Sequence, residues 1–226
     1  EHILDAEEFA HLSDEERAPG SLAFAPTSGP VDLRDTTQWW RWTPGAQWRH
    51  PVGPLSDLNG RDSHPVVHVA YADALAYAEW IGARLPSEAE HEYAAAGGGR
   101  PSPYVWGRER DPGGVIMANT WHGRFPYLNT GANGWVGTSP VGSFPPNGYG
   151  LYDCIGNVWE WTSDLYTGAH HAADEQGPGE STARRVLKGG SYLCAPEHNL
   201  RYRPAARCPQ PEDTSTNDIG FRCVRS

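Results

Sequence analysis

The clearest periodic pattern of hydrophobic positions lies in residues 73–81. Ala74, Tyr77, Ala78 and Ile81 occupy positions i, i+3, i+4 and i+7 of this segment. This spacing places the four side chains on one face of a helix. Gly82 follows directly, and a glycine after the last periodic residue is a common helix stop. The pattern therefore predicts a helix over residues 73–81.

A second helix is predicted over residues 87–96, where the signal is polar rather than hydrophobic. Ser87 and Glu90 have the spacing of a capping box, in which each side chain accepts a hydrogen bond from the other residue's backbone N–H. The segment continues through Tyr93 and then meets three consecutive glycines, residues 97–99. Glycine has a low helix propensity, so we expect the helix to end at residue 96.

Beyond residue 100 the hydrophobic runs become short, and Gly, Pro and Asn separate them. Such separators are typical of turns, and short runs between turns are typical of strands. We expect strands at residues 186–187, 191–194, 200–203 and 220–224, which form a short antiparallel sheet. The chain shows no internal repeat and no interdomain linker. We therefore predict one α+β domain over residues 1–226, rich in loops.

The composition agrees with a loop-rich globular protein. The 226 residues include 26 Gly and 20 Pro, but also ten Trp and ten Tyr, which can anchor irregular backbone. Disordered chains are poor in aromatic residues, so disorder is rejected. The net charge is −10, and no basic run indicates a nucleic-acid partner. No apolar stretch reaches the roughly 18 residues that a membrane span needs.

The cysteines indicate a reducing compartment. The chain has four cysteines, Cys154, Cys194, Cys208 and Cys223, which are too few to stabilise a chain of this length by disulfide bonds. One of them is therefore free to be a functional thiol. We expect a cytoplasmic monomer. Because the chain begins at Glu1 rather than at a methionine, we also expect that residues upstream of it are missing.

Seven short motifs follow one another along the chain, at residues 64–69, 84–90, 118–121, 147–152, 156–161, 188–192 and 220–223. A more specific run spans residues 189–207, where Cys194 precedes Arg201-Tyr202-Arg203 and Ala205-Ala206-Arg207. In these motifs and their order the chain resembles the prokaryotic formylglycine-generating enzymes, a family also called sulfatase-modifying factors. The resemblance covers nearly the whole chain. The family's strand-rich N-terminal segment has no counterpart before residue 1.

The resemblance implies a C-type-lectin-like fold and an unusual oxidation. Enzymes of this family use molecular oxygen and a copper(I) ion held by two thiolates. They convert the cysteine of a Cys-x-Pro-x-Arg motif in an unfolded sulfatase to Cα-formylglycine. Thiolates are soft ligands that select copper(I), so a cysteine pair suits this chemistry.

The expected cysteine pair is incomplete in this chain. Cys194 matches the first thiol of the family, although a buried cysteine can also be an inert core residue. The second thiol is expected five positions later, where Asn199 stands. An amide is a poor copper(I) ligand, so the family's pair cannot form as usual. Cys208 is a less favoured substitute, because it lies beyond Arg207.

Other site residues are implied by the resemblance and have plainer alternatives. Ser191, Ser215 and Asp218 match positions around the oxygen-binding pocket but are also typical turn residues, and Asp218 stands where the family has Asn. Arg207 is expected either in the substrate groove or in an ion pair with Asp213. The walls of the groove are expected to be aromatic: Trp39, Trp40, Trp159 and Tyr202.

Two calcium sites are also implied. Calcium takes six to eight oxygen ligands from carboxylates and carbonyls. The matching positions are Asn119, Thr120, Asn133 and Trp135 for one ion, and Asp153, Gly156, Val158 and Glu160 for the other. Asn133 replaces the family's usual Asp, which lowers the charge of the first site. Surface acids or an arginine ion pair are the alternative for Asp153 and Glu160.

Three functions fit these observations. The preferred one is an oxidase acting on a sulfatase cysteine, impaired by Asn199. The alternative is a non-catalytic, calcium-stabilised module of the same fold that binds peptides. A weaker third interpretation is the fold domain of a sulfoxide synthase.

His64 and His68 have metal-ligand spacing, but the valines between them favour a structural role.

Overall fold

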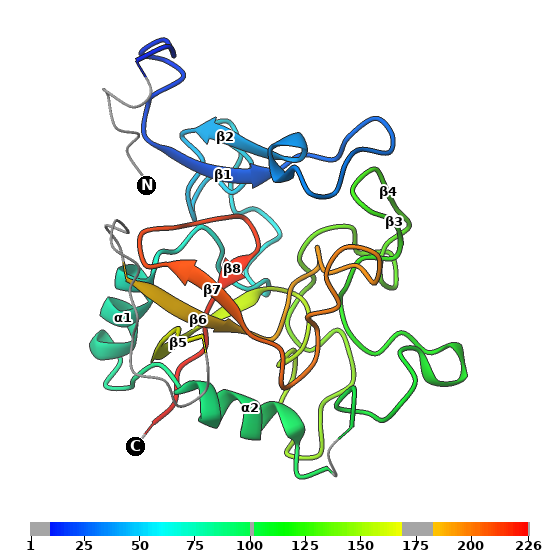
Figure 1. Ribbon diagram of the computed structural model, residues 1–226. Helices are drawn as coiled ribbons and strands as arrows, with labels where there is room; N and C mark the ends of the chain where they lie inside the picture. Colours follow the sequence, from blue (N-terminus) through cyan, green and yellow to red (C-terminus); the bar gives the residue numbers. More distant parts are fainter. Residues whose placement is uncertain (1–9, 100–101, 169–182, 226) are drawn as a thin grey trace.

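The computed structural model describes residues 10–99, 102–168 and 183–225, and its regular elements are short (Figure 1). The strands form a hairpin, a second small hairpin and a four-stranded sheet of order β7-β6-β5-β8. In chain order the elements are β1 (Gly20–Phe24), η1 (Thr36–Gln38), β2 (Trp40–Pro44), α1 (Tyr71–Trp80), α2 (Glu88–Ala96), η2 (Pro112–Gly114), β3 (Gly123–Arg124), β4 (Leu128–Asn129), β5 (Trp159–Leu165), β6 (Arg184–Lys188), β7 (Cys208–Pro211) and β8 (Ile219–Gly220).

Both predicted helices are confirmed. The first runs over Tyr71–Trp80, two residues earlier than expected, because the Asp73 carboxylate accepts a hydrogen bond from the Ala70 N–H at 2.9 Å. The second shows the capping box: Ser87 Oγ accepts from the Glu90 N–H at 3.1 Å, and Glu90 Oε2 accepts from the Ser87 N–H at 2.8 Å. Neither these helices nor any other described helix could cross a membrane.

The strand predictions are only partly correct. Residues 186–187 lie in β6 as expected, and Gly220 lies in β8. Residues 191–194 and 200–203 form turns and irregular segments instead. Gly189 and Gly190 have φ values of 90° and 77°, which turn the chain sharply after β6 and end the strand. The central strand β5 was not predicted.

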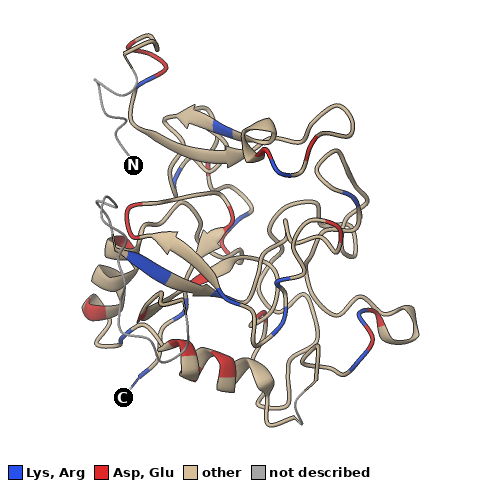
Figure 2. Ribbon diagram, viewed as in Figure 1, with Lys and Arg blue, Asp and Glu red and all other residues tan. Residues whose placement is uncertain are grey.

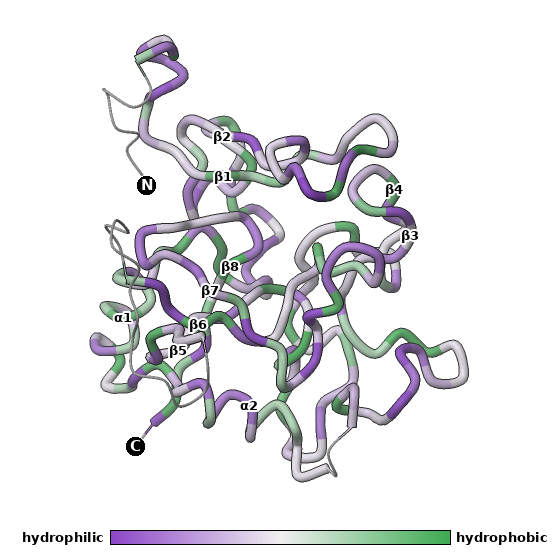
Figure 3. Tube along the Cα trace, viewed as in Figure 1, coloured by the Kyte–Doolittle hydropathy of each residue, from purple (hydrophilic) through white to green (hydrophobic). Residues whose placement is uncertain are grey.

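The four-stranded sheet combines near and distant segments. β5 pairs antiparallel with β6, β6 pairs antiparallel with β7, and β8 joins β5 in parallel. Helix α2 packs against β5 and β6, below the sheet in the view of Figure 1. In the hydropathy trace, hydrophobic stretches lie near β6 and β8 and also in outer loops (Figure 3). The main core lies here and includes Trp161, Leu187 and Cys194.

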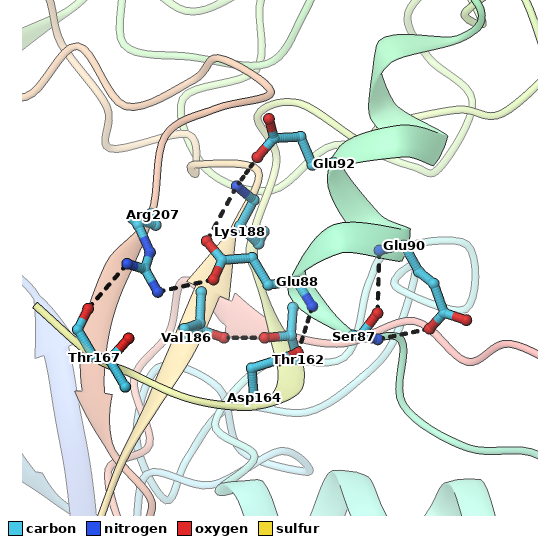
Figure 4. Close-up of polar contacts among 10 residues, drawn as sticks. All are labelled: Ser87, Glu88, Glu90, Glu92, Thr162, Asp164, Thr167, Val186, Lys188 and Arg207. Carbon is cyan, nitrogen blue, oxygen red and sulfur yellow. Dashed lines mark hydrogen bonds and ion pairs between the residues drawn. The ribbon is translucent and has the colours of Figure 1, made fainter. Parts of the chain in front are cut away.

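Charged side chains complete the contact between α2 and the sheet. Lys188, at the end of β6, has no exposed surface, and its Nζ lies 2.9 Å from Glu92 Oε2 and 3.7 Å from Glu88 Oε1. Arg207 Nη2 lies 2.8 Å from Glu88 Oε2 (Figure 4). The acids of α2, red in Figure 2, therefore neutralise cations that β6 and the segment before β7 bring inward. A buried charge is tolerated only when it is paired in this way.

The hairpin β1–β2 lies across the top of the sheet in Figure 1 and is fastened to the loop before β8. Leu22 forms an isolated bridge with Thr216, and Ser21 Oγ donates to the Ser215 carbonyl at 2.7 Å. A second apolar cluster supports the hairpin from the side, with Trp39, Trp121 and Phe125 among its members. The hairpin is therefore held over the sheet by contacts between residues far apart in sequence.

The central strand carries a buried acid that is fully paired. The Glu160 side chain is 6% exposed, and its Oε2 lies 2.6 Å from Arg222 Nε and 2.8 Å from His91 Nε2. Its Oε1 accepts a second bond from Arg222 Nη2 at 2.7 Å. Burial by itself raises the pKa of Glu160, but Arg222 and His91 outweigh it and lower the pKa to about 2. This trio joins β5, α2 and the C-terminal segment.

We expect Arg222→Gln to lower the free energy of unfolding by about 3 kcal/mol or more, because it leaves Glu160 buried without its main partner. Urea denaturation at neutral pH measures the change. The matched control is Arg84→Gln, because Arg84 also forms a two-bond pair, with Glu90, but on the surface. Solvent screening makes that loss much smaller. Similar losses in the two variants would contradict the role given to Arg222.

Candidate active site

A cavity of about 320 Å³ lies between the hairpin and the four-stranded sheet. Every strand of these two sheets contributes to its wall: Leu22 from β1, Trp40 from β2, Trp159 from β5, Leu187 from β6, Cys208 and Gln210 from β7, and Ile219 from β8. Thr36 of η1 and several loop residues supply the rest of the wall: Trp39, Phe125, Ser191, Leu193, His198, Asn199, Arg201, Thr214, Thr216 and Asp218. The site therefore exists only when segments from both halves of the chain come together.

Cys194 lies directly behind this wall. The turn at Gly189 and Gly190 brings Ser191 and Leu193 to the cavity, while the Cys194 side chain has no exposed surface. The Ser191 N–H donates to Cys194 Sγ at 3.3 Å. Burial raises the pKa of Cys194 to about 12, so the side chain is a neutral thiol in this arrangement.

A buried carboxylate faces the same cavity. Asp218 Oδ2 accepts a hydrogen bond from Ser191 Oγ at 2.8 Å, and Oδ1 accepts from Thr216 Oγ1 at 2.6 Å. Burial raises the pKa of Asp218. Ser191 and Asp218 thus meet as expected. Ser215 instead turns toward the hairpin, where its Oγ lies 2.9 Å from Ser21 Oγ.

The residues that follow Cys194 return to the cavity from the side. Asn199 lines it, and its buried Oδ1 has no hydrogen-bond partner among the described residues. Cys208, the first residue of β7, also lines the cavity. Arg201 Nη1 lies 2.8 Å from Cys208 Sγ. Burial raises the pKa of Cys208, and the Arg201 charge opposes this effect.

One side of the cavity is aromatic, as the sequence predicted for Trp39, Trp40 and Trp159. Two further rings were not predicted. Phe125 and His198 stack with their centroids 4.7 Å apart, and Trp39 meets both edge-on at 5.2 Å. No local signal could have found these rings, because residues 125 and 198 meet only in the folded chain.

Two predicted groove residues lie elsewhere. Tyr202 is 1% exposed and stacks on Tyr104 inside the core, with centroids 5.9 Å apart. Arg207 pairs with Glu88, donates to the Thr167 carbonyl at 3.0 Å and covers the Tyr166 ring. Neither is part of the cavity wall described here. The structure thus gives Arg207 an ion-pair role, with Glu88 in place of the expected Asp213.

The first predicted calcium site contains an unused buried oxygen. Asn119 has no exposed surface and donates through Nδ2 to the Gly137 carbonyl and to Ser139 Oγ, at 2.9 and 3.1 Å. Its Oδ1 has no partner among the described residues. Thr120 is buried beside it, and Asn133 has a φ of 52° in the tight turn that leads to Trp135. An orphaned amide oxygen suits a hard cation.

The second predicted calcium site is differently arranged. Gly156 approaches the Asn119 carbonyl so closely that a Cβ would lie 2.5 Å from that oxygen, and Val158 is buried next to it. Asp153 Oδ2 accepts from the Gly142 N–H at 2.7 Å. Glu160, however, already uses both oxygens for Arg222 and His91. The arginine ion pair, weighed as the alternative for Glu160, is what the structure contains.

No group of three or more His, Cys, Asp or Glu side chains within the described ranges is arranged to hold a metal ion. Of the two histidines with metal-ligand spacing, His68 has a structural role, and His64 Nδ1 lies 2.9 Å from Thr138 Oγ1. His68 is 2% exposed, and its ring nitrogens contact Ser21 Oγ at 2.7 Å and the Pro51 carbonyl at 2.9 Å. All four cysteines fall in the described ranges, and each is a free thiol.

Comparison with known proteins identifies the family. The model of the sulfatase-modifying factor enzyme 1-like domain matches residues 6–226. The chain belongs to this family. The resemblance drawn from the motifs is thereby confirmed, and so is the predicted loop-rich α+β fold of the formylglycine-generating enzymes.

Two bacterial family members are especially similar. The formylglycine-generating enzyme of Mycobacterium tuberculosis is 56% identical over 235 residues, which cover 99% of this chain and 78% of the relative. That of Streptomyces coelicolor is 47% identical over 223 residues, covering 95% of this chain and 71% of the relative.

A mouse protein named inactive Cα-formylglycine-generating enzyme 2 is 40% identical over 198 residues, covering 86% of this chain and 60% of that protein. The family therefore includes active and inactive members.

A solved structure has the same fold. PvdO from Pseudomonas aeruginosa superposes with a TM-score of 0.54 at 30% identity. The match covers 71% of this chain and 61% of PvdO, so this chain spans less than two thirds of that protein. The overall fold of this chain is therefore shared with a solved structure.

The buried Asp218 makes stability depend on pH. Its pKa in the folded protein lies above the usual 3.8, so the folded state binds this proton more tightly than the unfolded chain. The resulting stabilisation is complete below pH 3.8 and is lost as the pH rises through the higher folded pKa. Near neutral pH the buried charge is therefore a cost.

We expect Asp218→Asn to raise the free energy of unfolding near neutral pH, by about 1.4 kcal/mol for each unit by which burial raises the pKa. The gain should shrink toward zero at pH 4. Urea denaturation at both pH values measures it, with the exposed Asp57→Asn as the control. A gain of equal size at the two pH values would show that the charge of Asp218 is not its cause.

Proposed function

We propose that this chain oxidises the cysteine of a Cys-x-Pro-x-Arg segment in an unfolded sulfatase to Cα-formylglycine, using molecular oxygen. The observation that carries the proposal is the cavity between the hairpin and the sheet, where Ser191 contacts Cys194 through its N–H and Asp218 through its hydroxyl group. Support comes from the name of the 56% identical mycobacterial relative. We also propose that the chain is a single domain and a monomer.

The wall of the cavity suits an extended peptide. Trp40 offers a half-buried aromatic surface that can cover peptide backbone, and Trp39 and Trp159, only 1% and 6% exposed, support the wall from the core. The chain carries a net charge of −10, which favours a substrate that bears an arginine. Ser191 and Asp218 are the polar groups best placed to meet a small molecule such as oxygen in the same space.

The residues present do not fit the family's copper site as that site is usually built. Cys194 supplies one sulfur, and Asn199 supplies an amide with a free buried oxygen instead of the second. Copper(I) prefers soft ligands, so an amide oxygen is a poor replacement. We therefore derive no step of the reaction through a metal bound by residues 194 and 199.

The alternative is a module of the same fold that binds the peptide without oxidising it. Asn199 favours this alternative, and the family does contain a mouse member named inactive. Both functions require the same peptide-binding surface. They differ only in whether the bound cysteine is converted.

The deciding experiment incubates the protein with oxygen, copper(I) and a peptide that contains Cys-x-Pro-x-Arg, and follows the aldehyde by mass spectrometry. We expect slow conversion by the unsubstituted chain, faster conversion by Asn199→Cys and none by Cys194→Ala. A peptide with Arg→Glu controls for recognition and should bind more weakly. If peptide binds but no variant converts it, the binding module is the correct function. Absence of binding would exclude both.

We also propose that calcium stabilises the fold through the Asn119 site, and the second predicted site remains open. A ligand that binds only the folded state stabilises it, by about 2.7 kcal/mol at 100 times its Kd. Chelation should therefore lower the melting temperature, and Asn119→Ala should remove this sensitivity because it removes the orphaned Oδ1. Asn59→Ala, at an exposed asparagine, is the control. A melting curve that chelator leaves unchanged would exclude structural calcium.

A further inference from the structure

The turn over residues 195–199 places an acid at the rim of the cavity. The His198 and Asn199 N–H groups both donate to the Ala195 carbonyl, at 3.2 and 2.8 Å, and this closes the turn. His198 and Asn199 line the cavity, whereas the preceding Glu197 is exposed to solvent. The Glu197 carboxylate therefore lies where the cavity wall meets the surface.

This carboxylate is held in place by one of its two oxygens. Glu197 Oε1 accepts a hydrogen bond from the Phe125 N–H at 2.8 Å. The Phe125 ring lines the cavity and stacks on the ring of His198, the residue next to Glu197. Within the described ranges, no hydrogen bond engages Glu197 Oε2. One oxygen thus fixes the side chain against the wall, and the other is free to accept a ligand.

Two other acids near the cavity are already engaged. Asp218 is buried, and each of its oxygens accepts a hydrogen bond from a hydroxyl group. Asp35 uses Oδ1 for the N–H and hydroxyl of Thr37, at 3.1 and 2.6 Å, and Oδ2 for Gln38 Nε2 at 2.8 Å. Of these three acids, Glu197 alone combines exposure with an unused oxygen.

The geometry of the proposed peptide brings its cation to the rim. In Cys-x-Pro-x-Arg the arginine follows the cysteine by four residues, which span roughly 13–14 Å when extended. A cysteine inside the cavity therefore leaves the arginine outside it. Burial lowers the pKa of His198, so this ring is mainly neutral near pH 7 and does not repel a cation. The cation of the wall, Arg201, contacts Cys208 Sγ at 2.8 Å.

We propose that Glu197 is the specificity residue of this cavity and binds the arginine of the peptide through its free oxygen. Hydrogen bonds between a guanidinium and a carboxylate are stronger than those between neutral groups, so one such contact can select arginine at this position. The inference rests on the proposed function, because it names the residue that recognises one part of that substrate.

The test measures binding of two fluorescent peptides by anisotropy, without oxygen or metal. One peptide carries Cys-x-Pro-x-Arg, and the other has citrulline, which keeps the shape of arginine without its charge. We expect the unsubstituted chain to prefer the arginine peptide by about two- to fivefold, as for an exposed ion pair. Glu197→Gln should abolish this preference. Its amide oxygen can still accept from the Phe125 N–H, so the turn is kept.

The matched control is Glu79→Gln, at an exposed glutamate of α1, which should keep the full preference for arginine. Glu197→Lys should instead prefer the Arg→Glu peptide. The preference of the unsubstituted chain should shrink at high salt, because salt screens exposed charges. An equal loss of affinity for both peptides in Glu197→Gln would show that the residue acts through the turn and would overturn the proposal. So would a preference for arginine that Glu197→Gln leaves intact.

These outcomes are distinct from failure of the proposed function. If the unsubstituted chain binds neither peptide, the proposed function fails and the role of Glu197 fails with it. If the preference for arginine survives in Glu197→Gln and the aldehyde still forms, the function stands without this residue. If Glu197→Gln loses the preference but no variant forms the aldehyde, Glu197 keeps its role in a binding module.

Discussion

The Glu160 carboxylate, buried and neutralised by Arg222 and His91, is the interaction on which the rest of the structure depends. Glu160 lies on β5, opposite Lys188 of β6 and Gly220 of β8. Its partners come from α2 and from the C-terminal segment. In a fold with so few regular elements, this paired charge links β5 to α2 and to the C-terminal segment. An unpaired carboxylate at this depth would be too costly to keep.

The interior charges divide into two kinds. Glu160 and Lys188 are buried and compensated by opposite charges, so they fix the positions of α2, β5 and β6. Asp218 is buried with hydrogen bonds from Ser191 and Thr216 and faces the cavity. Burial destabilises the charged form of this carboxylate, and the groups that donate to it are hydroxyls rather than cations. Stability alone therefore does not explain an acid at this position. A perturbed acid in a cavity is typical of functional sites, and this supports the proposal that the cavity is the active site.

The chain has its family's fold, and two polar side chains stand out on the cavity wall. Asn199 supplies an amide there, and Asp218 supplies an acid. Both lie on the cavity wall, together with Cys208 and the Arg201 that contacts it. Loops carry both residues, whereas the paired charges that hold the strands lie inside the core.

The sequence by itself determined the features that depend on neighbouring residues. The capping box of Ser87 and Glu90 is local, and so are the helix stop at Gly97 and the family motifs around Cys194 and Trp159. It could not determine that residues 191–194 turn rather than extend, that Arg207 pairs with Glu88, or that Cys208 reaches the cavity. These three features depend on the pairing of strands and on the ion pairs formed in the folded chain. Such pairings join residues far apart in the chain, and only burial in the folded molecule selects among them.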